Sequence, residues 1–116
     1  HDQSSAASDV YKRQVVEEVD EGDEIAKALG DKKVAILQNH GILTTGPSVD
    51  IALWFYMSME RCCQAQLMAE AAGKPISVSH ETAVKTREFI ANDIAAWASY
   101  QPAFDKIVKM QPDLLD

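Results

Sequence analysis

The sequence predicts an α/β fold that is part of a larger domain. Two short apolar segments, 34–37 and 42–45, are typical of neighbouring strands, and an uninterrupted segment from Val49 to Ala72 is typical of one long helix. Shorter helical segments precede and follow them. Two short strands cannot cover a helix of that length. We therefore expect the back half of a larger sheet with its helices.

The first fourteen residues are expected to be an artefact and disordered. Residues 4–14, SSAASDVYKRQ, have no hydrophobic period, and with suitable codons they correspond to the adapter of transposon-based sequencing libraries. A native disordered leader is the alternative. On the adapter interpretation the native protein extends upstream of Val15, and the chain is a truncated piece.

A short helix is predicted from Glu21 to Leu29. Acidic residues dominate its start, where the helix dipole favours carboxylates, and Asp20 with Asp23 resembles a capping box. Gly30 follows at the position of a left-handed C-cap.

The two predicted strands are Val34–Leu37, with the residue types of a strand buried on both faces, and Ile42–Thr45. Between them, Asn39-His40-Gly41 places a histidine at a strand end beside a glycine that tolerates positive φ. Strand ends are where α/β proteins often hold ligating groups, so His40 is the leading candidate site residue, although a structural turn histidine is the commoner case.

The long predicted helix, Val49–Ala72, has Ser48 as its N-cap and Gly73-Lys74-Pro75 at its end. Its apolar first half predicts packing on a sheet and on another subunit. Beyond it, Ser79 is predicted to cap a helix from His80 to Ala91, with Val84 and Ile90 inward. A further helical segment follows, and Pro102 is expected to start another.

Composition and charge exclude several classes of function. The net charge of −7 argues against a nucleic-acid or anionic-membrane partner. The only two cysteines, Cys62 and Cys63, are adjacent and lack metal-ligand spacing, which indicates a reduced, cytoplasmic protein. The longest apolar run, Ile51–Met57, is far short of the roughly 20 residues that cross a bilayer.

Several segments together resemble the class II aldolase/adducin superfamily. They are Ala26, Leu29–Asp31, Ile36–Gly46, Val49–Ala52 and Met59–Gln66, and the tail segments Trp97–Pro102 and Pro112–Leu115 are similar to the ends of some members. The resemblance implies a three-layer α/β/α domain with a mostly antiparallel sheet, assembled as a homotetramer. Residues 15–75 would be the C-terminal half of that domain and residues 76–116 a helical C-terminal extension.

The resemblance also implies a lyase of carbohydrate metabolism with a divalent metal, most often zinc. In active members three histidines hold the metal, two from an upstream His-x-His and the third from the Asn-His-Gly turn, here His40 between Asn39 and Gly41. The metal polarises the carbonyl of a small hydroxy-carbonyl compound or sugar phosphate and stabilises an enediolate during C–C cleavage or epimerisation.

This chain departs from that pattern because it contains no His-x-His. A catalytic zinc needs three protein ligands, so the site is incomplete and we expect the chain alone to be inactive. The general acid/base residue is not identified, with Tyr100 a candidate because members can lend C-terminal residues to a neighbouring subunit's site. A non-catalytic, adducin-like oligomerisation or interaction domain is the alternative to a truncated lyase. A self-contained helical binding module is disfavoured by the exposed strand edges and the apolar long helix.

Overall fold

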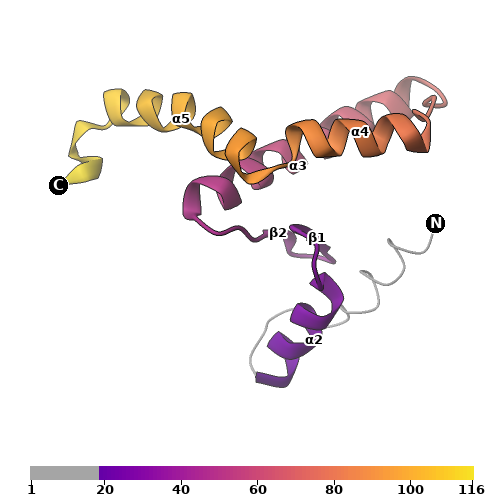
Figure 1. The fold of residues 1–116 in the computed structure, drawn as a ribbon, viewed down its shortest axis with the longest axis horizontal. Helices are drawn as coiled ribbons and strands as arrows, with labels where there is room; N and C mark the ends of the chain where they lie inside the picture. Colours follow the sequence, from indigo (N-terminus) through magenta and orange to yellow (C-terminus); the bar gives the residue numbers. More distant parts are fainter. Residues whose placement is uncertain (1–18) are drawn as a thin grey trace. The chain divides into compact units, whose positions relative to one another are not determined.

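The computed structural model describes residues 19–116 (Figure 1). The expected adapter, residues 1–14, and the first carboxylates of the acidic block, Glu17 and Glu18, lie outside the described residues. The chain divides into two compact units, with the boundary between Thr45 and Gly46. Helices and a two-stranded antiparallel sheet make up the described residues, as the predicted α/β class requires.

The first unit begins with helix α2, Val19–Leu29. It starts two residues before the predicted Glu21, so Asp20 lies inside the helix and the predicted capping box is wrong. Gly30 ends α2 as predicted, with φ 55° and its N–H donating to the Ala26 carbonyl at 2.9 Å.

A hairpin of β1, Val34–Leu37, and β2, Gly41–Thr44, completes this unit. Val34 lies opposite Thr44 and Leu37 opposite Gly41. This register explains why β2 begins at Gly41, one residue before the predicted start. The Thr45 N–H continues the pairing by donating to the Lys33 carbonyl at 2.9 Å.

The prediction that β1 is buried on both faces is wrong for the described residues. Ile36 is 49% exposed and its strand neighbours are half-buried. Burial on both faces requires a layer on each side of a sheet. Among residues 19–116 the sheet has only β1 and β2.

The second unit starts with α3, Val49–Ala72, whose bounds match the prediction. Ser48 is the N-cap, and its Oγ accepts the Ile51 N–H at 3.4 Å. At the other end the Gly73 N–H donates to the Ala69 carbonyl at 3.0 Å. Both predicted ends of the long helix are confirmed.

Two helices and a 3-10 turn follow: α4, His80–Ile90; α5, Asp93–Met110; and η1, Pro112–Leu115. Ser79 caps α4 as predicted, accepting the Thr82 N–H at 3.2 Å. Of the two residues predicted to point inward, Val84 is half-buried but Ile90 is 56% exposed, so the prediction for Ile90 is wrong; α4 ends at Ile90, one residue short of the predicted Ala91.

Pro102 lies inside α5, so the prediction that it starts a new helix is wrong. Proline removes one N–H donor from a helix. The side-chain amide of the preceding Gln101 donates to the Trp97 carbonyl at 3.1 Å, which adds a hydrogen bond in the turn just before the proline.

The core of the second unit lies where α3 packs on α5. Ile51 and Phe55 of α3 are 7% exposed, and Ala96 of α5 is fully buried. The small Ala96 side chain allows the two helix backbones to approach closely. None of the helices between residues 19 and 116 combines the length and the apolar character needed to cross a membrane.

Candidate functional site

The predicted residues Asn39 and His40 lie in the turn of the hairpin, and Gly41 is the first residue of β2. Three residues, Gln38 to His40, connect the paired ends of β1 and β2. Asn39 is in the left-handed region at φ 61°, and Gly41 has φ 142°. The His40 N–H donates to the Leu37 carbonyl at 3.1 Å, which closes the turn.

This geometry explains the residue types in the turn. Asparagine is one of the few residues with a side chain that adopt left-handed backbone at low cost, and a φ of 142° favours glycine. The hydrogen bonds between β1 and β2 hold the backbone on both sides of the turn. The hairpin therefore gives His40 a defined backbone position.

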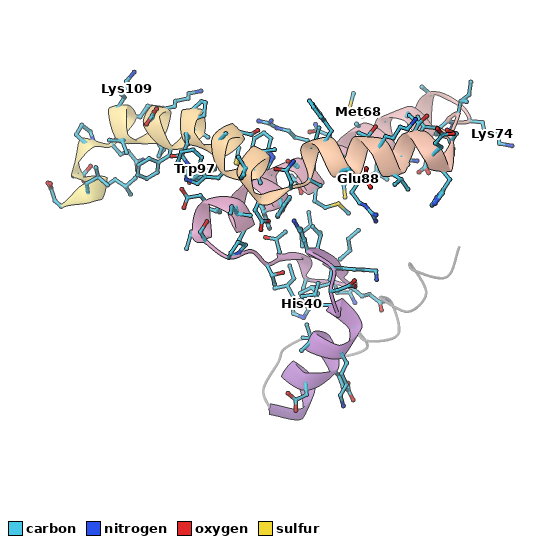
Figure 2. The ribbon with its side chains drawn as sticks, in the orientation of Figure 1. His40, Met68, Lys74, Glu88, Trp97 and Lys109 are labelled. Carbon is cyan, nitrogen blue, oxygen red and sulfur yellow. The ribbon has the colours of Figure 1, made fainter. Side chains whose placement is uncertain are left out.

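The imidazole of His40 lies at the exposed end of the hairpin (Figure 2). Among residues 19–116 it has no hydrogen-bond or ion-pair partner. No described side chain therefore competes with a metal or a small molecule for its ring nitrogens.

A complete metal site is absent from the described residues. Between residues 19 and 116 no three His, Cys, Asp or Glu side chains gather as a ligand set. His80, the other histidine in this range, is the exposed first residue of α4 and belongs to the other compact unit. Because a catalytic zinc needs three protein ligands, the residues present do not by themselves fit a bound metal.

Tyr100, the candidate acid/base residue, lies in the middle of α5 and is half-buried. Its ring packs against Phe104 one turn later, with centroids 6.5 Å apart and planes tilted by 43°. A pair at this spacing stabilises the helix in which both residues lie. Tyr100 and His40 belong to different compact units.

A contact that the sequence analysis missed connects α3 with α5. Gln101 donates its side-chain N–H to Asp50 Oδ2 at 3.0 Å. Asp50 lies in the first turn of α3, where a carboxylate is favoured by the helix dipole. Asp50 and Gln101 are 51 positions apart, so no local sequence pattern indicates that they pair.

The two cysteines of α3 are free thiols. Cys62 is exposed and Cys63 is half-buried. Neither is paired with a histidine or carboxylate in a ligand set within residues 19–116.

Comparison with known proteins shows which family the chain resembles. Residues 5–67 match the family described as the class II aldolase and adducin N-terminal domain. The match includes the whole hairpin and most of α3.

Two relatives from Streptomyces cover 82% of this chain over 95 aligned residues. One is the decarboxylase NovR of Streptomyces niveus, at 39% identity. The other is a 4-hydroxy-3-prenylphenylpyruvate oxygenase/4-hydroxy-3-prenylbenzoate synthase of Streptomyces roseochromogenus subsp. oscitans, at 37% identity. The chain spans 35% and 34% of the length of these relatives.

The fold is similar to that of an L-fuculose 1-phosphate aldolase from Glaciozyma antarctica PI12. The TM-score is 0.76 at 35% identity, and the match covers 96% of this chain and 43% of that one. The predicted fold class, a fragment of a class II aldolase domain, is thereby confirmed.

Proposed function

The chain belongs to the class II aldolase and adducin family, and from that membership we propose that it is the hairpin and C-terminal part of a lyase. The proposed reaction is C–C cleavage or epimerisation of a small hydroxy-carbonyl compound, such as a sugar phosphate. The observation that carries the proposal is the Asn39–Gly41 turn at a strand end, where the imidazole of His40 is exposed and has no hydrogen-bond or ion-pair partner among residues 19–116.

The names of the similar proteins support the lyase class. An aldolase and a decarboxylase both break a carbon–carbon bond, and both names occur among the matches. The oxygenase/synthase name of the third protein shows that family members differ in the reaction they are named for. Class II aldolase folds are typically dependent on a divalent metal.

We propose His40 as one ligand of such a metal, and zinc as that metal because it readily accepts imidazole nitrogen as a ligand. The remaining ligands would come from residues outside 19–116, since the described residues supply no complete set. On this proposal the 116-residue chain by itself is inactive. The proposed assembly is a homotetramer in the cytoplasm.

A second candidate is a non-catalytic, adducin-like oligomerisation domain. The observation in its favour is the lack of a complete ligand set among residues 19–116. An interaction domain needs no metal ligand at position 40. The exposed imidazole of His40, which has no hydrogen-bond or ion-pair partner among residues 19–116, therefore supports the lyase over this alternative.

Sequencing the gene across the codons for residues 1–18 is the first test. A His-x-His and a nearby acidic residue upstream of Val15 are expected, and a contiguous upstream reading frame without those histidines would favour the interaction domain.

The second test uses the complete gene product, purified and measured for bound zinc and for C–C cleavage of sugar phosphates and 2-oxo acids. We expect about one zinc per subunit and turnover of one of these substrates. The 116-residue chain is the matched control and is expected to bind no zinc and to be inactive. A complete gene product without bound metal or turnover would overturn the lyase proposal.

A further inference from the structure

We propose that the segment between Gly73 and Ala91 opens and refolds as one unit while α3 and α5 stay packed on each other. We refer to residues 74–90, which contain α4 and the loop before it, as the α4 strap. Lys74 at its start and Glu88 near its end are labelled in Figure 2. The inference concerns the folding of this segment and does not depend on the proposed reaction.

The α4 strap contributes no buried side chain to the helical unit. All of its residues are exposed except Val84, which is half-buried. Its large apolar groups are held by little packing, since Ile76 is 97% exposed and Phe89 is 82% exposed. α4 also makes few contacts with α3 or α5. Burial of apolar surface is the main favourable contribution to folding, and the α4 strap supplies little of it.

The polar contacts of the α4 strap are local as well. Ser79 caps α4 by accepting the Thr82 N–H at 3.2 Å, and Lys85 pairs with Glu81 at 2.8 Å. Among residues 19–116, the hydrogen bonds and ion pairs of the strap stay within it or reach the two residues that follow it. α4 has 11 residues, and a helix of that length is marginally stable in water without tertiary packing. Local contacts therefore hold α4 only weakly.

The contact between α3 and α5 does not rely on the α4 strap. Its apolar core consists of Ile51 and Phe55 on α3 and Ala96 on α5. Its polar contact is the 3.0 Å hydrogen bond from Gln101 to Asp50. All five residues lie outside the strap, so these contacts can persist when the strap opens.

The helix ends on either side of the α4 strap are also closed by residues outside it. The Gly73 N–H donates to the Ala69 carbonyl at 3.0 Å at the end of α3. Asn92 Oδ1 accepts the Ala95 N–H at 2.9 Å at the start of α5. Opening of the strap therefore leaves both neighbouring helices capped. Segments with few buried contacts open at a lower free energy than the core of the same protein.

Hydrogen exchange of the 116-residue chain, measured residue by residue by NMR, tests the inference. Relative to their unfolded rates, the amides of residues 84–90 should exchange at least about a hundredfold faster than those of Phe55 and Ala96. Equal protection in α4, α3 and α5 would overturn the inference, because α4 would then open only when the whole helical unit unfolds.

Two helix caps provide matched variants for the same measurement. Ser79→Ala removes the side-chain cap of α4 and should speed exchange in α4 about fivefold, with α3 and α5 unchanged. Ser79→Asp keeps a capping side chain and should retain the parent rates. Ser48→Ala removes the corresponding cap of α3 and should leave exchange in α4 unchanged, because α4 exchanges through its own opening. If Ser79→Ala sped exchange equally in all three helices, the strap would not be a separate unit.

Chymotrypsin provides an independent measurement, because cleavage of a transiently open segment follows the population of its open form. The two sites to compare are Phe89 in the strap and Tyr56, which is 42% exposed on α3. With each rate divided by that of the urea-unfolded chain, cleavage after Phe89 should be at least about tenfold faster. Ser79→Ala should speed the cut after Phe89 and leave the cut after Tyr56 unchanged. Equal cleavage at the two sites would contradict independent opening of the α4 strap.

Discussion

The side-chain amide of Gln101 donates to the Asp50 carboxylate at 3.0 Å and to the Trp97 carbonyl at 3.1 Å. One amide thus connects the first turn of α3 with the turn of α5 that precedes Pro102. Asp50 directly precedes Ile51, a member of the small apolar core between these helices. We infer that this polar contact contributes to the relative orientation of the two helices.

Gln101→Ala is expected to lower the free energy of unfolding of the helical unit by about 1 kcal/mol, the typical net value of a protein hydrogen bond. Urea unfolding followed by tryptophan fluorescence measures this, because the chain's two tryptophans, Trp54 and Trp97, both lie in this unit. Gln66→Ala is the control, since within the described part of the chain its side-chain amide bonds only to Glu70, on the exposed surface of α3. That change should cost about 0.3 kcal/mol; equal losses would contradict the orienting role of Gln101.

Gly46→Ala should destabilise the start of α3. A Cβ at this position would lie 2.9 Å from Ile51 Cγ2 and 3.0 Å from the Ala52 nitrogen, so the first turn would have to move. Overpacking of this kind costs about 2 kcal/mol, and the urea midpoint should fall accordingly. Gly73→Ala, with no heavy atom within 4 Å of the added Cβ, is the matched control. A midpoint unchanged in both variants would show that the turn adjusts freely.

Asn39→Val should strain the hairpin turn, because a β-branched residue at φ 61° is about 1–2 kcal/mol less favourable. The His40 N–H reports on the turn through its 3.1 Å hydrogen bond to Leu37. Its hydrogen exchange should become about tenfold faster in the valine variant. Asn39→Gly should keep the protection, since glycine adopts this backbone readily. Unchanged exchange in the valine variant would mean that the turn is not held at positive φ.

His40→Ala in the complete gene product should lower the zinc content and abolish turnover while the oligomer stays assembled. The reason is that the exposed imidazole makes no hydrogen bond or ion pair with other described side chains that its loss could disturb. Elemental analysis per subunit, activity and sedimentation measure the three quantities. His80→Ala, at the exposed start of α4, is the control and should change none of them. Full metal content in the His40 variant would remove this residue from the proposed ligand set.

The hairpin and the long helix could be predicted from local signals. Ser48 and Gly73 delimit α3 as expected, and Gly30 ends α2 as expected. These signals act within a few residues, through caps and backbone preferences. The start of α2 and the continuation of α5 through Pro102 were mispredicted, because local preferences do not decide such boundaries alone.

The sequence by itself determined the order of the elements from α2 to α4, the Asn39-His40-Gly41 turn and the family resemblance that the comparisons confirm. Only the tertiary structure decided which residues meet across the chain: Asp50 with Gln101, and Ile51 and Phe55 on the helix that packs against Ala96. It also decided that Ile36 and Ile90 stay exposed although their residue type favours burial. The physical reason is that apolar patterning indicates only that moving a side chain out of water is favourable in free energy. Which surface covers it depends on how distant segments pack.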